Sequence, residues 1–137
     1  MVEFALILPL LLIVMFIIVD FGFGFSKWVI VTNAAREGAR FGAIGAPLDQ
    51  VVARTVETSN GILTAADVEA AYIDRNGNAA ADRGDHVAVR ATHNYQLLTP
   101  LEPLLKLTGF SPIPLSACTD MRLEITVAGA TAGGGGC

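Results

Sequence analysis

Residues 3–45 read EFALILPLLLIVMFIIVDFGFGFSKWVIVTNAAREGARFGAIG, and this stretch decides the fold. Phe4 to Val19 are sixteen residues without a charge, and Pro9 is the single proline of the stretch. We expect one long helix over about residues 1–45, which at 1.5 Å per residue is about 65–70 Å long. It is apolar at its start and amphipathic at its end.

With the aromatic and glycine residues up to Ser26, the apolar run reaches the length of about 20 residues that crosses a bilayer. A secretory signal peptide fits poorly, because no basic region precedes the run and no small-x-small cleavage site follows it. Two interpretations stay open. The helix is a permanent transmembrane anchor, or it moves from lipid into the core of a polymer.

Two acids argue against a plain anchor, because a lone carboxylate in lipid is costly unless it is paired. Glu3 precedes the apolar run, and Asp20 interrupts it near its far end. We expect Glu3 to pair with the α-amino group of a neighbouring subunit, and Asp20 to pair with Lys27 or with a neighbour. The alternatives are a headgroup position for Glu3 and a solvated boundary for Asp20.

The helix has expected weak points and an expected packing face. Pro9 removes a backbone hydrogen bond, and Gly22 and Gly24 add a second weak point, so we expect bending there when the helix leaves lipid, although transmembrane helices also tolerate such residues. Small residues at helical spacing beyond Lys27 allow close backbone approach. The sheet should pack on this part of the helix through Val31, Ala35, Gly38 and Gly42.

The chain divides into the apolar half of the helix (1–26), its amphipathic half (27–45), and a globular domain with a glycine-rich tail (46–137). Periodicity in the domain predicts a helix, three strands and a short apolar helix, at Leu48–Thr58, Val68–Ile73, His86–Thr92, about Leu115–Val127, and Pro100–Leu107. A helix packed on a small antiparallel sheet is an α+β fold.

The loop between the first two strands is rich in oxygen ligands, at Asp74, Asn76, Asn78 and Asp82. It is a weak calcium candidate, because a calcium-hand loop has Gly at its sixth position and Glu at its twelfth, and here glycine is fourth and aspartate twelfth. A polar hairpin tip is the preferred interpretation. His86 and His93 are seven apart and face opposite sides of a strand. We expect no metal and no cofactor.

The two cysteines, Cys118 and Cys137, are separated by a tail with four successive glycines. The flexible tail lets the end fold back to form a disulfide, which would place the domain in an oxidising compartment. Two free thiols or an intermolecular bridge are the alternatives. Lys27, Arg36 and Arg40 follow the apolar run and would place the domain in the cytoplasm. A basic leader removed from the chain would resolve this conflict.

Several function classes are disfavoured. The formal net charge of -4 without a Lys/Arg cluster argues against nucleic acid as a partner. The sequence contains no Gly-x-Ser-x-Gly elbow, phosphate loop or zinc spacing, so we do not expect an enzyme.

The residues VEFALILPL at 2–10, the aromatic-glycine segment after Asp20, and NAAREGAR at 33–40 closely resemble TadE-like proteins of the tight-adherence pilus systems. Leu98-Thr99-Pro100-Leu101 before the final strand is similar too. The resemblance implies a type IV pilin-like subunit, with a basic leader cut by a prepilin peptidase and a sheet domain outside the cytoplasm. In that class an acid usually occupies the fifth mature position, whereas Glu3 is third here.

We therefore expect a structural subunit of an extracellular pilus-like filament, held in the inner membrane before assembly and exposed on the cell surface afterwards, with a role in adhesion. Its expected partners are identical subunits, the prepilin peptidase and the pilus assembly machinery. The alternatives are a single-pass, membrane-anchored extracytoplasmic binding module and a minor pseudopilin that primes pilus assembly.

Overall fold

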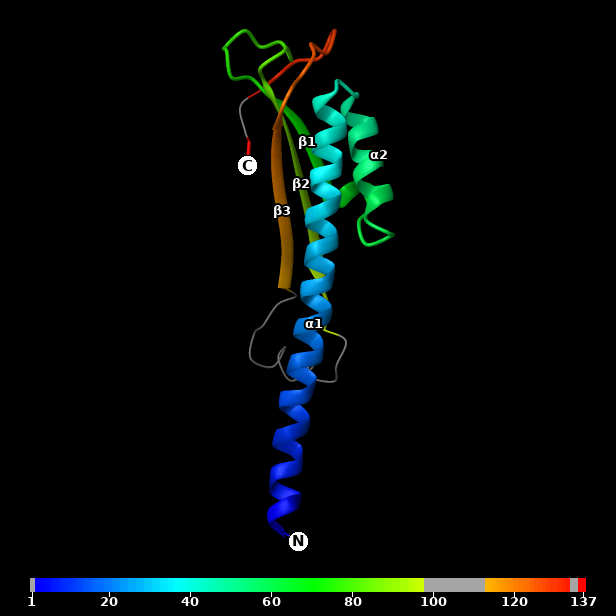
Figure 1. Ribbon diagram of the computed structural model, residues 1–137, viewed down its shortest axis with the longest axis vertical. Coiled ribbons are helices and arrows are strands. Elements are labelled where there is room, and N and C mark those ends of the chain that lie inside the picture. Colours follow the sequence, from blue (N-terminus) through cyan, green and yellow to red (C-terminus); the bar gives the residue numbers. More distant parts are fainter. Residues whose placement is uncertain (1, 98–112, 134–135) are drawn as a thin grey trace.

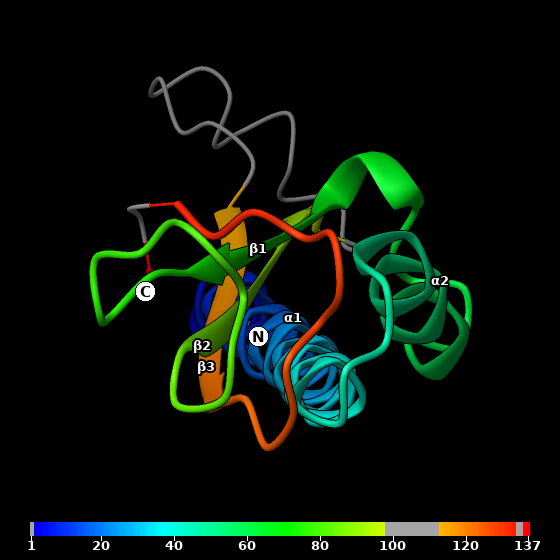
Figure 2. The same cartoon turned by 90° about the horizontal axis from the view of Figure 1, so that it is seen from above.

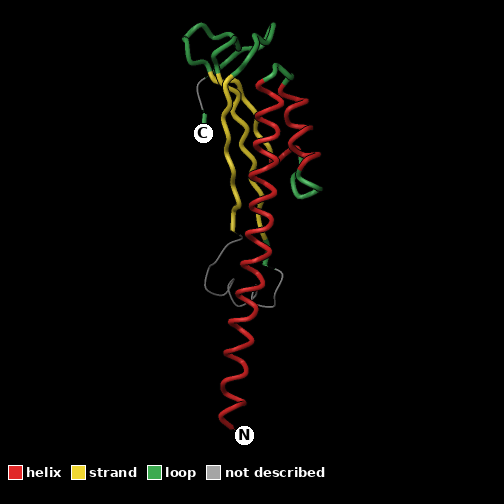
Figure 3. Tube along the Cα trace, viewed as in Figure 1, coloured by secondary structure: helices red, strands yellow, loops and turns green. Residues whose placement is uncertain are grey.

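The computed structural model describes residues 2–97, 113–133 and 136–137. Its first element is the helix α1, Val2–Ala43, which extends far beyond the sheet at its N-terminal end (Figures 1 and 3). At 1.5 Å per residue its 42 residues span about 63 Å. The helix α2, Leu48–Thr58, lies beside the C-terminal part of α1 (Figure 1). The expected helix Pro100–Leu107 lies outside the described residues.

Three antiparallel strands form one sheet in the order β1-β2-β3. The central strand β2, His86–Tyr95, pairs on one side with β1, Val68–Ile73, and on the other with β3, Ile113–Arg122. Seen along its axis, α1 lies against one face of this sheet (Figure 2). The predicted α+β fold, a long helix on a small antiparallel sheet, is confirmed.

The prediction for the last strand was wrong at its C-terminal end, because β3 stops at Arg122 and does not reach Val127. Arg122 pairs with His86, the first residue of β2. Beyond it, the Leu123 N–H donates to the Asp85 carbonyl at 2.7 Å and the Leu123 carbonyl accepts the Gly84 N–H at 3.2 Å, and β2 offers no residue opposite the positions that follow. The Glu124 N–H instead donates to the Ala43 carbonyl at 2.9 Å, and this bond turns the chain over the end of α1. The alternation of apolar residues continued past the point where the pairing ended.

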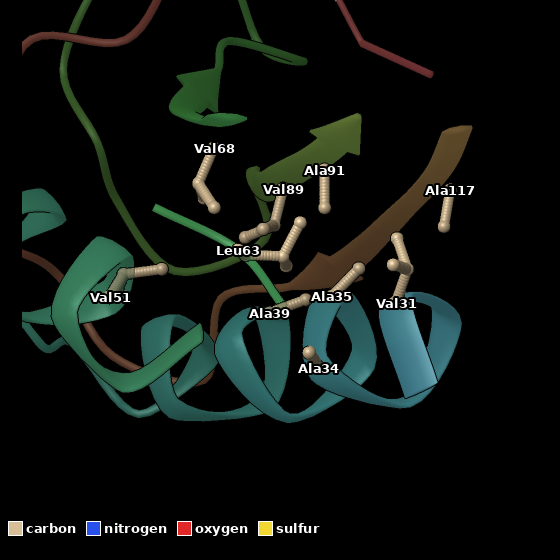
Figure 4. Packing of buried hydrophobic residues seen from close by; sticks show 10 residues of the cluster. All are labelled: Val31, Ala34, Ala35, Ala39, Val51, Leu63, Val68, Val89, Ala91 and Ala117. Atoms are coloured by element: carbon tan, nitrogen blue, oxygen red, sulfur yellow. The ribbon is translucent and has the colours of Figure 1, made fainter. Parts of the chain in front are cut away.

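The main core lies between the C-terminal half of α1, the sheet and α2 (Figure 4). On α1, Val31, Ala34, Ala35 and Ala39 are completely buried. Figure 4 shows them grouped with Val51 of α2, Leu63, and residues of each strand. Because three of the four α1 side chains are alanines, the helix backbone approaches its neighbours closely.

Two glycines of α1 complete this close approach. A Cβ at Gly38 would collide with the Thr55 hydroxyl of α2, and a Cβ at Gly42 would lie 2.9 Å from Val87 Cγ2 of β2. Both distances are too short for unstrained packing, so glycine is required for contact and not for conformational freedom.

The C-terminal tail adds to the free edge of β1. The Gly133 N–H donates to the Tyr72 carbonyl at 2.9 Å, and the Asp74 N–H donates to the Gly133 carbonyl at 3.0 Å. The tail then returns to β3, where Cys137 forms a disulfide with Cys118. Sequence reasoning expected this link but not the strand-like pairing beside β1.

Candidate membrane and assembly interface

The N-terminal part of α1 is strongly apolar, and few of its described side chains are buried. Its exposed large side chains, here called the apolar segment, are Phe4, Ile7, Leu8, Leu10, Leu11, Leu12, Ile13, Val14, Met15, Ile17, Ile18, Val19, Phe21, Phe23 and Phe25. A helix that is hydrophobic all round needs an apolar environment on every side. The helix is long and apolar enough to cross a membrane by length and composition, and little of its most apolar part is buried.

The apolar segment meets the sheet at Asp20. This residue is only 4% exposed, so the solvated boundary considered for it does not describe the structure. The Tyr95 hydroxyl, at the end of β2, donates to the Asp20 backbone carbonyl at 3.2 Å. The Lys27 ammonium lies 5.3 Å from the centroid of the Tyr95 ring, within the range of a cation–π contact. Tyr95 therefore joins the helix to the base of the sheet.

The environment of Tyr95 affects its ionisation. Burial, and secondarily the negative charge of Asp20, raise the pKa of the Tyr95 hydroxyl above its ordinary value. The hydroxyl consequently stays protonated and keeps donating its hydrogen bond throughout the neutral range.

Aromatic side chains of α1 cluster near this junction. Phe21, Phe23, Phe25 and Trp28 are all exposed, and the Phe25 and Trp28 rings lie 5.7 Å apart. Phe21, Phe25 and Trp28 line an apolar cavity of about 390 Å³ together with Tyr95 and Ile113 at the base of the sheet. Tryptophan is enriched where a helix leaves the hydrocarbon layer, so Trp28 suits a position at a membrane boundary.

The predicted subunit-pairing and bending residues lie as follows. Glu3 is in the first turn of α1, and the helix is continuous through Pro9, Gly22 and Gly24. Gly22 faces open space, whereas a Cβ at Gly24 would lie 3.4 Å from the Tyr95 ring. Pairing by Glu3 and Asp20, and bending on departure from lipid, remain predictions.

The four oxygen-rich residues of the weak calcium candidate come together, but they bind each other and the loop backbone. Asp74 accepts the N–H groups of Asn76, Gly77 and Ala79 at 2.9, 2.6 and 2.8 Å. Asp82 accepts the side-chain amides of Asn76 and Asn78 at 2.8 and 2.6 Å. The backbone donors, with Ala79 contributing most, lower the pKa of Asp74.

Within the ranges that the structure describes, no group of three or more His, Cys, Asp or Glu side chains could hold a metal ion. His86 and His93 do not come together, because they lie seven positions apart on β2 and His86 binds Asp120, with 2.9 Å between Nδ1 and Oδ2. The loop carboxylates hold the shape of the hairpin.

Sequence reasoning missed Tyr95 and Trp28 as junction residues. Tyr95 lay beyond the predicted end of its strand at Thr92, and its partner Asp20 is 75 positions away. The available signal was local: an aromatic side chain continuing the alternation of Val87, Val89 and Ala91.

Comparison with known proteins bears on the N-terminal part of the chain. Residues 1–40 match the family model described as TadE-like protein. This match confirms the resemblance seen in residues 2–10, after Asp20 and in residues 33–40. The resemblance at Leu98-Thr99-Pro100-Leu101 lies outside the matched and the described residues. No curated protein and no solved structure matches the chain significantly.

Proposed function

We propose, from the match of residues 1–40 to the TadE-like family model, that this chain is a structural subunit of an extracellular pilus-like filament. The family match and the exposed apolar helix fit a pilus-associated protein that is anchored in a membrane. The proposed further step is polymerisation, in which the apolar segment leaves the inner membrane and enters the filament core. The sheet domains then lie outside, on the cell surface, where they would mediate adhesion.

The observation that carries the proposal is the division of one unbroken helix into two environments. The large side chains of the apolar segment are exposed, whereas Val31, Ala34, Ala35 and Ala39 are buried against the sheet and α2. At about 63 Å, α1 is roughly twice as long as a hydrocarbon core is thick. A bundle of such helices would cover the apolar segments of neighbouring subunits and keep each sheet domain at the outside.

Glu3 is the proposed determinant of subunit register. Lipid is already apolar, so transfer of the apolar segment into a bundle gains free energy mainly from packing and polar pairing. A Glu3 carboxylate bound to the α-amino group of the next subunit would satisfy two buried charges together. Removal of one partner of such a pair typically costs about 3–5 kcal/mol. Asp20 is the second proposed pairing residue.

The proposed partners follow from this assembly. They are identical subunits, the membrane before assembly, a prepilin peptidase that removes a basic leader, and the pilus assembly machinery. The disulfide between Cys118 and Cys137 supports a domain outside the cytoplasm, since disulfides persist in oxidising compartments.

The decisive experiment is electron microscopy and mass spectrometry of surface material sheared from cells that express the protein. Filaments in which this chain is the main component support the proposal. Recovery of the chain only from membranes would instead indicate a single-pass binding module. A few copies per filament would indicate a minor pseudopilin that primes assembly. Each of these last two outcomes contradicts a main structural subunit.

Substitution of Glu3 tests the pairing. We expect Glu3→Gln, which keeps the size but removes the charge, to lower the sheared fraction as strongly as Glu3→Ala while the membrane-bound amount stays unchanged. Ile7→Leu is the matched control, because it changes the same part of the helix without altering charge or polarity. Normal filaments from Glu3→Gln would show that the charge has no role in assembly.

A further inference from the structure

The sequence contains two Asn-Gly pairs, Asn60-Gly61 and Asn76-Gly77. In such a pair the backbone nitrogen of glycine can attack the asparagine side-chain carbonyl, because glycine has no side chain to obstruct the approach. We infer that Asn60 is a site of spontaneous deamidation in the folded protein and that the loop around Asp74 protects Asn76 from the same reaction.

Three hydrogen bonds hold Asn76 and Gly77 away from reaction. The Gly77 N–H, which carries the attacking nitrogen, donates to Asp74 Oδ1 at 2.6 Å. The Asn76 side-chain Nδ2 donates to Asp82 Oδ1 at 2.8 Å, and its Oδ1 accepts the Asn78 N–H at 3.0 Å. The attack would require the nitrogen to leave a carboxylate and the amide to rotate out of two further bonds.

Asn60 and Gly61 have none of these restraints. They follow Ser59, the C-cap of α2, and both are exposed. Across the described ranges, no hydrogen bond engages the Asn60 side chain or the Gly61 N–H. Nothing lies within 4 Å of the position that a Gly61 Cβ would occupy, so a five-membered ring has space to form.

The reaction is a cyclisation followed by hydrolysis. The Gly61 nitrogen forms a bond to Asn60 Cγ, the bond from Cγ to Nδ2 breaks, and the proton lost by the Gly61 nitrogen leaves with the amide as ammonia. Water then adds to either carbonyl of the succinimide and opens it, which yields aspartate or isoaspartate at position 60. No oxidant, reductant or cofactor takes part.

The product would weaken the end of α2. It adds a negative charge directly after the C-cap, where the helix dipole already concentrates partial negative charge. An isoaspartate additionally lengthens the backbone by one carbon atom at this turn. Deamidation of Asn60 would therefore accumulate with time and alter the C-terminal end of α2.

The test is peptide mass spectrometry of the purified full chain after incubation in mildly alkaline buffer, with the mass gain of one dalton followed at each asparagine. We expect Asn60 to convert at least about tenfold faster than Asn76, because a bond from Gly77 N–H to a charged carboxylate reduces its availability by about that factor. In Asp74→Ala, the rate at Asn76 should rise toward that of Asn60 while the rate at Asn60 stays constant.

The internal control is the same chain after reduction of its disulfide and unfolding in denaturant. In that state both Asn-Gly pairs should deamidate at similar rates. This control stands even if Asp74→Ala fails to fold. Equal rates in the folded protein, a faster reaction at Asn76, or the same ratio in the denatured chain would overturn the inference. Failure of folded Asn60 to react while the denatured chain converts would also overturn it.

Discussion

The two halves of α1 have the same secondary structure and opposite surroundings. The apolar segment, which ends at Phe25, exposes its large side chains, whereas residues 31–43 bury mainly small ones against the sheet and α2. Large exposed residues suit a fluid or repeated environment that can adjust to them. Small buried residues suit one fixed set of neighbours, because close backbone approach leaves no room for rearrangement. Side-chain size thus separates the part of the helix that the proposed assembly would transfer between environments from the part with fixed neighbours.

The largest expected effect concerns the disulfide, which stabilises the sheet domain and lies outside the apolar half of α1. Cys118→Ser removes a disulfide whose cysteines are 19 positions apart. We expect the free energy of unfolding of the domain to fall by about 3 kcal/mol in the chain-entropy model. Chemical denaturation of the full chain in detergent, followed by circular dichroism, measures this change. Cys137→Ser should reproduce it, and an unchanged unfolding midpoint in both variants would contradict a stabilising role.

The next effect compares one substitution in the two halves. Gly38→Ala places a methyl group against Thr55, so we expect a loss of about 1–3 kcal/mol in the free energy of unfolding. Gly22→Ala faces open space and should be neutral, or stabilising by about 0.5–1 kcal/mol, because alanine favours helix. Thermal unfolding of both variants in the same detergent provides the comparison. Equal effects at the two positions would remove the distinction between the halves.

A smaller effect concerns the junction between the halves. Tyr95→Phe removes the hydroxyl that donates to the Asp20 carbonyl and keeps the ring beneath Lys27. We expect a loss of about 1 kcal/mol, the usual net value of one hydrogen bond. Compared with the unsubstituted chain, Tyr95→Phe should speed up hydrogen exchange in α1 more around Gly24 than in the core around Ala35. A uniform change along α1 would indicate that Tyr95 does not act locally.

The smallest effect concerns the loop farthest from the apolar half. Three backbone N–H groups bind the Asp74 carboxylate and lower its pKa, so its contribution to stability is fully present above the ordinary pKa of aspartate, about 3.9. That contribution is lost as the pH falls through the lowered pKa of the folded state. Nuclear magnetic resonance titration should give a midpoint for Asp74 below 3.9 in the folded chain and near 3.9 in denaturant. Equal midpoints would mean that the loop does not bind the carboxylate.

Much of the architecture was predictable because its signals are local. An apolar run with one proline predicted the long helix, and alternation predicted the strands near their observed positions. Ala35, Gly38 and Gly42 on the expected packing face followed from small side chains at helical spacing. The disulfide was an expectation that the structure now shows between Cys118 and Cys137.

The rest depended on contacts between distant residues. The end of β3 is set by where β2 begins, and no property of residues 123–127 themselves records this limit. The bond from Tyr95 to Asp20 spans 75 positions, and the pairing of Gly133 beside β1 requires the sheet to exist first. Periodicity describes which face a residue occupies within its own element. It does not describe which other element comes to that face.

Because α1 is continuous through Asp20, the number of residues before Asp20 sets the rotation of the N-terminal end about the helix axis. An α-helix has 3.6 residues per turn, so each residue inserted between Glu3 and Asp20 would rotate the N-terminal end by about 100° relative to the sheet. It would also move that end by about 1.5 Å along the axis. While the helix is unbent at Pro9, the seventeen positions from Glu3 to Asp20 define one orientation between the first turn of the helix and the face of the sheet. A neighbouring molecule that contacts both the first turn of α1 and the face of the sheet must match this angle as well as the distance between them.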